Sequence, residues 1–520
     1  MDKIKYIYSM IKKIVFFVCA SLLFFSCEHE VSNRSLIENY IKAEILSDYQ
    51  ALNNYDYSIP NTAEVYNREI HTDLNDTSSK SYLILMYLAG DSNAIQTNLF
   101  ANMVSVSKGM WYSQADIKTI ALFDGIYETQ TGGAESKLFD VRANRSCTSS
   151  SLNNYRITNN LPSWISSGEV DTGSYETLSN FISWAEENYN AAGERKTILV
   201  IGSHGFGTQG TEVSLSQSNT IFDSTSNSFC PDYTTTSSGT IIHTNEVSLA
   251  LSNAGFGASN KIDMLIYDVC LCGTIEEAYE VKDYAKALIY SPNSVPGAGF
   301  PYEKVIANIR PKSSLFSLGE NTVKLFAEQY KNMICIYRPC TITFVDLSFA
   351  GGIEEDVSAL ADFFVENPSY SFIFNDSSYS YLKYKDNIST ANVNYKCTYF
   401  ITRYAMKNFY SFDLGYLCDK VQDYAQNIVD SVKQEELETI CENIKTHLEN
   451  MICLSWRGAD IYNNSSNSYT VFNSSRNYYG ITIVGNSDSS NYNPYAKNEF
   501  AFNTDSTWKT LLELLYPEDF

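Results

Sequence analysis

Five short apolar runs recur between residues 82 and 291, and each ends at a glycine or near a polar residue. Continuous apolar runs of this length are typical of strands that are buried on both faces of a sheet. The predicted strands are Tyr82–Gly90, Asp116–Phe123, Lys196–Gly202, Lys261–Asp268 and Ala287–Ser291. Helical patterns lie between several of them, at Ser174–Tyr189, Thr244–Gly255 and Thr274–Ala285. This alternation predicts an α/β fold with a mostly parallel sheet flanked by helices.

Two reactive side chains follow two successive predicted strands. His204 comes just after Lys196–Gly202 in the sequence GSHGFG, and Cys270 comes just after Lys261–Asp268 in IYDVCLCG. In parallel sheets, functional residues gather beyond the carboxyl ends of the strands, and successive strands often adjoin. We therefore expect His204 and Cys270 to meet at one edge of the sheet.

These residue types suit a nucleophilic hydrolase. Cys270 precedes a predicted helix start, where the partial positive charge of the helix favours a thiolate. Thr274 and Glu277 form a capping-box pattern that supports a helix start there. His204 could act as the general base, and the backbone N–H groups of Gly205 and Cys270 could hold an oxyanion.

Other interpretations stay open on chemistry alone. A buried cysteine is often only a small apolar side chain, and a histidine after a strand is often only a hydrogen-bonded structural residue. A metal site built from Cys270, Cys272 and His204 would lack a fourth ligand, so no metal centre is predicted. A Cys270–Cys272 disulfide would be strained, because one residue separates them. His243 is the rival candidate for the base.

The charge and the cysteine spacing narrow the function further. The formal net charge of −23 disfavours nucleic acid as a partner. The 12 cysteines of this 520-residue chain form no paired CxxC units, which argues against a structural zinc site. A few disulfides are compatible with an exported protein, but the cysteine spacing does not assign their connectivity. The sequence also leaves the oligomeric state open.

The N-terminus has the pattern of an export signal. Four lysines within the first 13 residues precede the apolar run Ile14–Phe25, which ends at Ser26-Cys27. The run is too short for a lasting transmembrane helix and is typical of a secretory signal. The break at Cys27 resembles a bacterial lipoprotein signal, although Phe24 stands where an aliphatic residue is usual. We predict an exported, lipid-anchored protein that faces the periplasm or the cell surface; an ordinary secretory signal is the alternative.

The chain divides into four predicted segments. They are the signal at 1–27, a polar tether with a short helix at 28–80, the main domain at 81–350, and a mixed α+β C-terminal region at 351–520 that packs on it. Within the main domain, the Ser/Thr-rich residues 205–243 are predicted to form a long loop or insertion.

Several segments, taken in order, resemble the clostripain-type cysteine peptidases, peptidase family C11 of the caspase-like clan. They are Leu83–Gln96, Leu178–Gly207 with its His-Gly pair, Ile262–Val281 with an Asp-x-Cys-Leu-x-Gly pattern, and Ser291–Tyr302 with a Pro-Gly-x-Gly-aromatic loop. Together with weaker matches further on, the resemblance covers roughly residues 82–515. It implies a caspase-like sheet in a catalytic domain.

The resemblance also implies roles for individual residues. Cys270 would be the nucleophile of a Cys-His dyad, and His204 the general base. Gly205 and Cys270 would supply the oxyanion N–H groups. Asp268 would line the pocket for the P1 side chain, with a strand-end cap as its alternative role. The expected activity is that of an endopeptidase, which cleaves proteins or peptides through an acyl-enzyme intermediate. No cofactor is expected apart from calcium, which some relatives use as a structural aid.

Two departures from the family pattern put a strictly basic P1 preference and self-cleavage in doubt. Ala298 stands where relatives that cleave after Arg or Lys can carry an acidic residue, and no Lys or Arg occurs between His204 and Lys261. We therefore expect a relaxed or shifted P1 preference that still tolerates basic side chains. The alternative function is a non-catalytic surface lipoprotein of the same fold that acts as a binding module.

Overall fold

The description below rests on a computed structural model of the chain. It covers residues 68–78, 81–91, 95–125, 135–165, 168–205, 213–214, 221–222, 228–232, 240–293, 295–331, 335–336, 340–374, 409–458, 460–463, 469–472, 479–487 and 501–515. The predicted signal with Cys27, and the short helix of the tether, lie outside the described residues.

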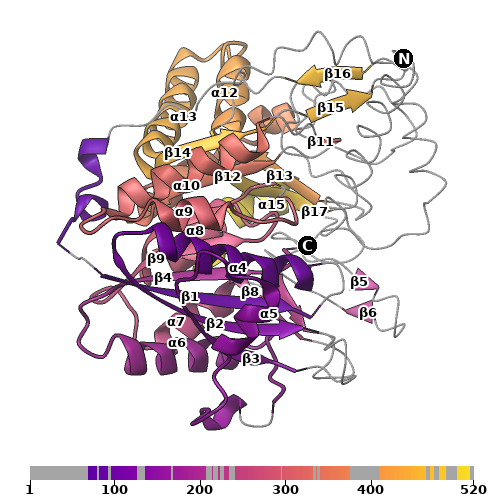
Figure 1. Ribbon diagram of the computed structural model, residues 1–520. Coiled ribbons are helices and arrows are strands. Elements are labelled where there is room, and N and C mark those ends of the chain that lie inside the picture. The colour runs from indigo at the N-terminus through magenta and orange to yellow at the C-terminus, as the bar shows by residue number, and fades with distance from the viewer. Residues whose placement is uncertain are drawn as a thin grey trace, which may run out of the picture.

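A single eight-stranded sheet forms the centre of the molecule, with the order β14-β12-β10-β9-β4-β1-β2-β3 (Figure 1). Its strands are β1 (Ser81–Gly90), β2 (Asp116–Gly125), β3 (Lys137–Val141), β4 (Lys196–Gly202), β9 (Ile262–Asp268), β10 (Ala285–Tyr290), β12 (Thr341–Asp346) and β14 (Ile452–Arg457). The five strands predicted from the apolar runs are β1, β2, β4, β9 and β10. They pair with one another in parallel, whereas β3, β12 and β14 pair antiparallel with their neighbours. The predicted α/β fold with a mostly parallel sheet is confirmed.

The central strands are apolar without alternation because both of their faces are buried. In β1, Leu83, Leu85 and Tyr87 belong to one hydrophobic core, while Ile84 and Met86 belong to another on the opposite face. All of these side chains are at most 2% exposed. Side chains of a strand alternate between the faces, so a sheet covered on both sides requires an apolar residue at every position.

Helices cover both faces of the sheet. One core is closed by α6 (Tyr175–Tyr189), α7 (Thr244–Asn253), α8 (Ile275–Val281) and α11 (Ala350–Glu366). The other is closed by α4 (Gln96–Tyr112), α9 (Tyr302–Ala307) and α10 (Leu315–Tyr330), with the short α5 (Ser149–Leu152) nearby. Among the described residues, the helices lack the combination of length and apolar character that crossing a membrane requires.

The helix after Cys270 begins where the capping pattern predicts. The Thr274 hydroxyl accepts a hydrogen bond from the Glu277 N–H at 3.2 Å. The reciprocal half of the box does not form, because the Glu277 carboxylate accepts the Thr244 hydroxyl at 2.6 Å instead. Thr244 is the first residue of α7, and His243 occupies its N-cap position.

Residues of the predicted C-terminal region extend and brace the main sheet. Strand β14 is its edge strand, next to β12. The region further contains β13 (Phe409–Asp413), α12 (Leu414–Ala425), α13 (Ser431–Met451), β15 (Asp460–Asn463), β16 (Tyr469–Phe472), β17 (Thr482–Ser487), α14 (Ala501–Asp505) and α15 (Trp508–Leu515). Helices α12 and α13 lie side by side at the top of Figure 1. The Thr482 N–H donates to the carbonyl of Gly273 at 3.0 Å, so this region contacts the loop that carries Cys270.

The predicted loop at 205–243 contains short strands. Strand β5 (Val213–Ser214) pairs with β6 (Ile221–Phe222), and β7 (Ser228–Asp232) pairs with β8 (Thr240–His243). Strands of two to five residues carry too little periodicity to be identified in a Ser/Thr-rich sequence. Cys230, in β7, is fully buried, so the insertion packs on the main domain at this point.

Candidate active site

The register of two neighbouring strands places His204 and Cys270 at the same edge of the sheet. Strands β4 and β9 are parallel neighbours, and Gly202 pairs with Asp268. His204 and Cys270 each follow that pair by two residues. The prediction that these two strands adjoin is confirmed, and the two reactive residues emerge together at the carboxyl ends of the strands.

The backbone of Gly205 contacts Cys270 directly. A Cβ atom added to Gly205 would lie 2.1 Å from the carbonyl oxygen of Cys270 and 2.9 Å from its nitrogen. Both distances are below any real Cβ contact, so only glycine fits at this position. The contact brings the predicted oxyanion donors, Gly205 and Cys270, together in one place.

The turn that carries Cys270 is strained and held in place. Leu271 has a φ of +66°, a left-handed conformation that non-glycine residues rarely adopt. Its N–H donates to Asn293 O at 2.8 Å, and Gly273 N–H donates to Ser291 O at 2.8 Å. These bonds fasten the turn after β9 to the loop after β10, and strain of this kind persists only where the surroundings impose it.

Cys270 and Cys272 are not bonded to each other. Cys272 is a buried thiol that forms no disulfide; it donates to the carbonyl of Cys270 at 3.3 Å and belongs to the hydrophobic core. Cys270 is 1% exposed and disulfide-bonded, and its partner is not one of the cysteines whose side chains are described. The N–H of Val295 donates to the Cys270 sulfur at 3.4 Å. A nucleophilic role for Cys270 therefore requires reduction of the disulfide.

His204 is nearly buried, at 8% exposure, at the edge of the sheet that also carries Cys270. Its carbonyl oxygen accepts the N–H of Cys230 at 3.4 Å, and the hydroxyl of the preceding Ser203 donates to Ala89 O at 2.8 Å. Backbone and neighbouring hydroxyl contacts thus fix the His-Gly segment between β1, β7 and the Cys270 turn.

The other described histidines have structural positions. His71 contacts Asp346 at 2.9 Å, and Asp346 pairs with Ala287 near the start of β10, at the edge opposite to Cys270. The Nδ1 atom of His447 is hydrogen-bonded to the carboxylate of Asp356, in the C-terminal region. The rival base His243 is half-buried at the cap of α7, where its N–H donates to Glu246 at 2.8 Å.

Asp268 is the last residue of β9 and is only 5% exposed. Its Oδ2 accepts the hydroxyl of Tyr302 at 2.8 Å and the Asn102 amide at 3.4 Å, and the carboxylate also accepts the backbone N–H of Phe300. Burial raises the pKa of Asp268 to about 7, although the hydrogen bonds from Tyr302 and Phe300 oppose the rise.

The loop with the Pro-Gly-x-Gly-aromatic pattern lies against this carboxylate. Gly299 has a φ of +68°, and a Cβ atom there would lie 2.5 Å from Asp268 Oδ2. Ala298, the position at which relatives can carry an acid, is exposed. The sequence did not identify Tyr302 and Asn102 as site residues. Tyr302 stands two residues beyond the glycine-rich loop, and no local signal marks Asn102.

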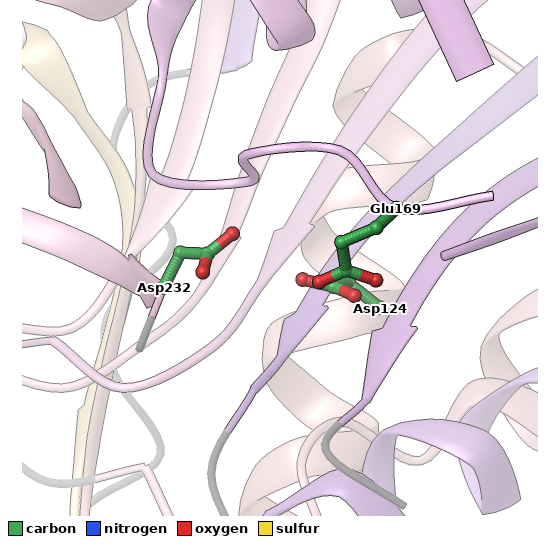
Figure 2. A group of neighbouring side chains, drawn as sticks. All are labelled: Asp124, Glu169 and Asp232. Carbon is green, nitrogen blue, oxygen red and sulfur yellow. The ribbon is translucent and has the colours of Figure 1, made fainter. Parts of the chain in front are cut away.

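A cluster of three acidic side chains lies at the carboxyl end of β2. Oxygen atoms of Asp124, Glu169 and Asp232 all lie within 4.8 Å of one another, and Figure 2 shows the carboxylates of Asp124 and Glu169 facing Asp232. Asp124 and Asp232 are fully buried. Burial, with added repulsion from Glu169 and Asp232, raises the pKa of Asp124 well above its usual range.

Hydroxyl and N–H groups surround these carboxylates. Ser136 and Thr172 donate their hydroxyls to Asp124 at 3.0 and 2.7 Å, and the Thr172 N–H donates to Asp232 at 2.9 Å. An all-oxygen donor set of this kind suits a hard cation such as Ca²⁺. Widely separated positions supply the three acids, so no sequence motif predicts the cluster.

The model of a protein family described as the Clostripain family matches residues 108–514. Clostripain from Hathewaya histolytica is 24% identical over 260 residues, which cover 47% of this chain and 45% of that protein. The chain thus spans about half the length of this curated relative.

Two solved structures share the fold. One is an inactive zymogen C11 protease from Parabacteroides distasonis, with 15% identity, a TM-score of 0.51, and coverage of 82% of this chain and 98% of that one. The other is a secreted C11 cysteine protease from Bacteroides thetaiotaomicron in complex with an irreversible peptide inhibitor, with 15% identity, a TM-score of 0.51, and coverage of 83% and 99%. At this identity the likeness concerns the fold alone.

Proposed function

Because the chain belongs to the clostripain family, we propose that it is a cysteine endopeptidase in which Cys270 is the nucleophile and His204 the general base. One observation carries the proposal. Gly202 of β4 pairs with Asp268 of β9, and His204 and Cys270 each follow that pair by two residues. Gly205 packs on the backbone of Cys270.

The proposed mechanism uses these residues in two steps. The Cys270 thiolate attacks the scissile carbonyl carbon, and the resulting oxyanion accepts hydrogen bonds from the N–H groups of Gly205 and Cys270. His204 then gives a proton to the leaving amine as the C–N bond breaks, which leaves a thioester on Cys270. In the second step His204 takes a proton from water, and the hydroxide releases the acyl group as a carboxylic acid.

Asp268 is the proposed acidic residue of the P1 pocket. Its position two residues before the nucleophile and its buried carboxylate support this role. Because Ala298 adds no second acid, we propose a relaxed P1 preference that includes basic side chains. Cleavage after arginine alone, across a panel of fluorogenic peptides, would contradict it.

Export and a lipid anchor at Cys27 are part of the same proposal, and the basic start and the apolar run before Cys27 support them. Metabolic labelling with a fatty-acid probe would detect the anchor. A Cys27→Ser chain that still carries the label would contradict lipidation at Cys27.

Calcium is proposed as a structural aid, because the clostripain-type relatives include calcium users. The donor set of Asp124, Glu169 and Asp232 fits such an ion: three carboxylates lie within 4.8 Å of one another, and two of them are fully buried. The bound ion would offset the repulsion among these carboxylates. The hydrolytic steps above do not involve it.

The decisive experiment compares Cys270→Ala with Cys272→Ala in the presence of a reductant. We expect the first change to abolish peptide hydrolysis and labelling by an acyloxymethyl ketone, and the second to preserve both. Equal loss in both variants would point to a structural role for this turn. A folded wild-type chain that neither cleaves nor labels would favour the binding-module alternative.

A further inference from the structure

Among the described residues, the hydrogen-bond donors to the carboxylate of Asp268 are neutral. The Tyr302 hydroxyl at 2.8 Å, the Asn102 amide at 3.4 Å and the Phe300 N–H supply its contacts. In the described part of the chain, no ion pair joins Asp268 to a lysine, arginine or histidine. A buried carboxylate without a countercharge either takes up a proton or receives a cation from outside the protein.

Close packing of two helices holds the donors in place. Asn102 lies on α4 and Tyr302 begins α9. A Cβ atom on Gly109 of α4 would lie 2.7 Å from the carbonyl oxygen of Glu303 in α9, so glycine is required for this approach. The phenol of Tyr302 is 3% exposed, and burial raises its pKa well above the usual value. Tyr302 therefore remains protonated and keeps donating to Asp268 across the physiological range.

We propose that Tyr302 and Asp268 together form a pH-dependent selector of the P1 side chain. A lysine or arginine is bound well only when Asp268 is ionised, whereas an uncharged side chain is accepted in either protonation state. The inference rests on the peptidase function proposed above and assigns Tyr302 as a specificity-determining residue that acts through Asp268.

The physical basis is a competition among a proton, a phenol and a cation for one carboxylate. Burial raises the pKa of Asp268 to about 7, so both forms are populated near neutral pH. Below that pH, a basic P1 side chain must displace the proton of Asp268 into solvent before it gains an ion pair. An uncharged side chain meets no such requirement, and its cleavage depends only on the ionisations of Cys270 and His204.

Described residues from α4, α9 and the loop before α9 surround the carboxylate of Asp268. Tyr302 from α9 and Asn102 from α4 face its Oδ2, and Gly299 of the loop lies against the same oxygen. Tyr330 from α10 donates to Gly299 O at 2.6 Å and does not contact the carboxylate. In the part of the chain that the structure describes, Tyr302 and Tyr330 are the titratable side chains that interact electrostatically with Asp268. Burial raises the pKa of both phenols, so they stay neutral in this pH range.

The test uses two fluorogenic peptides that differ only at P1, one with lysine and one with norleucine, which has a similar shape and no charge. Their kcat/KM values are measured with the reduced, full-length mature protein from pH 5.5 to pH 9. The ionisations of Cys270 and His204 affect both substrates and cancel in the lysine-to-norleucine ratio. We expect the ratio to fall roughly tenfold per pH unit below a midpoint near 7 and to level off above it.

Three variants separate specificity from structure. Tyr302→Phe removes a hydrogen bond that favours the ionised carboxylate, so the midpoint should rise by about 1 pH unit. Asp268→Asn should remove the pH dependence of the ratio. Tyr330→Phe is the matched control, because it deletes a phenol hydroxyl bonded to the same loop, and its midpoint should match the wild type.

Each outcome decides the proposal. A flat ratio in the wild type, or an unmoved midpoint in folded Tyr302→Phe, overturns this inference while Cys270-dependent hydrolysis continues. Failure to cleave any peptide overturns the proposed function and this inference with it. Should Tyr302→Phe not fold, the wild-type ratio and Asp268→Asn still decide between selection by charge and its absence.

Discussion

Replacing Gly205 by alanine tests whether the contact between the His-Gly segment and Cys270, the proposed nucleophile, supports catalysis. The added Cβ would lie 2.1 Å from the carbonyl oxygen of Cys270, whereas contacts below 3.0 Å do not occur in real structures. The two segments must therefore separate by about 1 Å, and a displacement of that size can cost about 100-fold in rate. The same movement displaces the Gly205 N–H, and losing one oxyanion donor costs about 100- to 1,000-fold in kcat.

We therefore expect kcat for a fluorogenic peptide to fall at least about 100-fold in Gly205→Ala. The measurement is the initial rate at saturating peptide with excess reductant, beside a thermal melt that reports folding. Gly351→Ala is the matched control, because a Cβ on Gly351 in α11 meets nothing within 4 Å. A folded Gly205→Ala enzyme with a kcat within about threefold of the wild type would refute the reasoning.

Three further predictions concern the thiols and the acidic cluster. Cys272→Ala should retain activity but lower the melting temperature, because the smaller side chain leaves a small cavity in the core. A loss of kcat larger than that of Gly205→Ala would contradict a packing role for Cys272. Activity should rise when dithiothreitol reduces the disulfide at Cys270, as measured by active-site titration, and equal titres with and without reductant would argue against it. Millimolar Ca²⁺ should raise the melting temperature above the value measured in a chelator, and Asp124→Asn should abolish that rise. Mg²⁺ is the matched control ion. Equal melting temperatures in calcium and in chelator would exclude the calcium proposal.

The existence and parallel direction of the central strands, and the adjacency of β4 and β9, could be predicted from the sequence. Burial on both faces demands continuous apolar runs, so β1, β2, β4, β9 and β10 stood out, with ends within a few residues. Strand β14 was not identified, since Ile452–Arg457 follows α13 without a break and ends in a polar Ser-Trp-Arg. Helices α4 and α10 were also missed, and α4 carries several serines and a glycine.

The candidate site was predictable in part. His204 and Cys270 could be identified because strand ends are marked locally and parallel strands present their carboxyl ends at one edge. The partners of Asp268 could not. Tyr302 and Asn102 lie 34 and 166 residues away in the chain, and only the packing of α4 against α9 brings them to the carboxylate.

The sequence by itself determined which residues could do chemistry and on which edge of the sheet they would meet. The local hydrophobic pattern sets where each strand begins and ends, and parallel strands present their carboxyl ends at the same edge. Only the tertiary structure decided the electrostatic state of those residues. Burial raises the pKa of Asp268 to about 7 and the pKa of Asp124 well above its usual range, since it removes the water that would stabilise the charged carboxylates. Burial is set by contacts among distant segments, which no short stretch of sequence encodes.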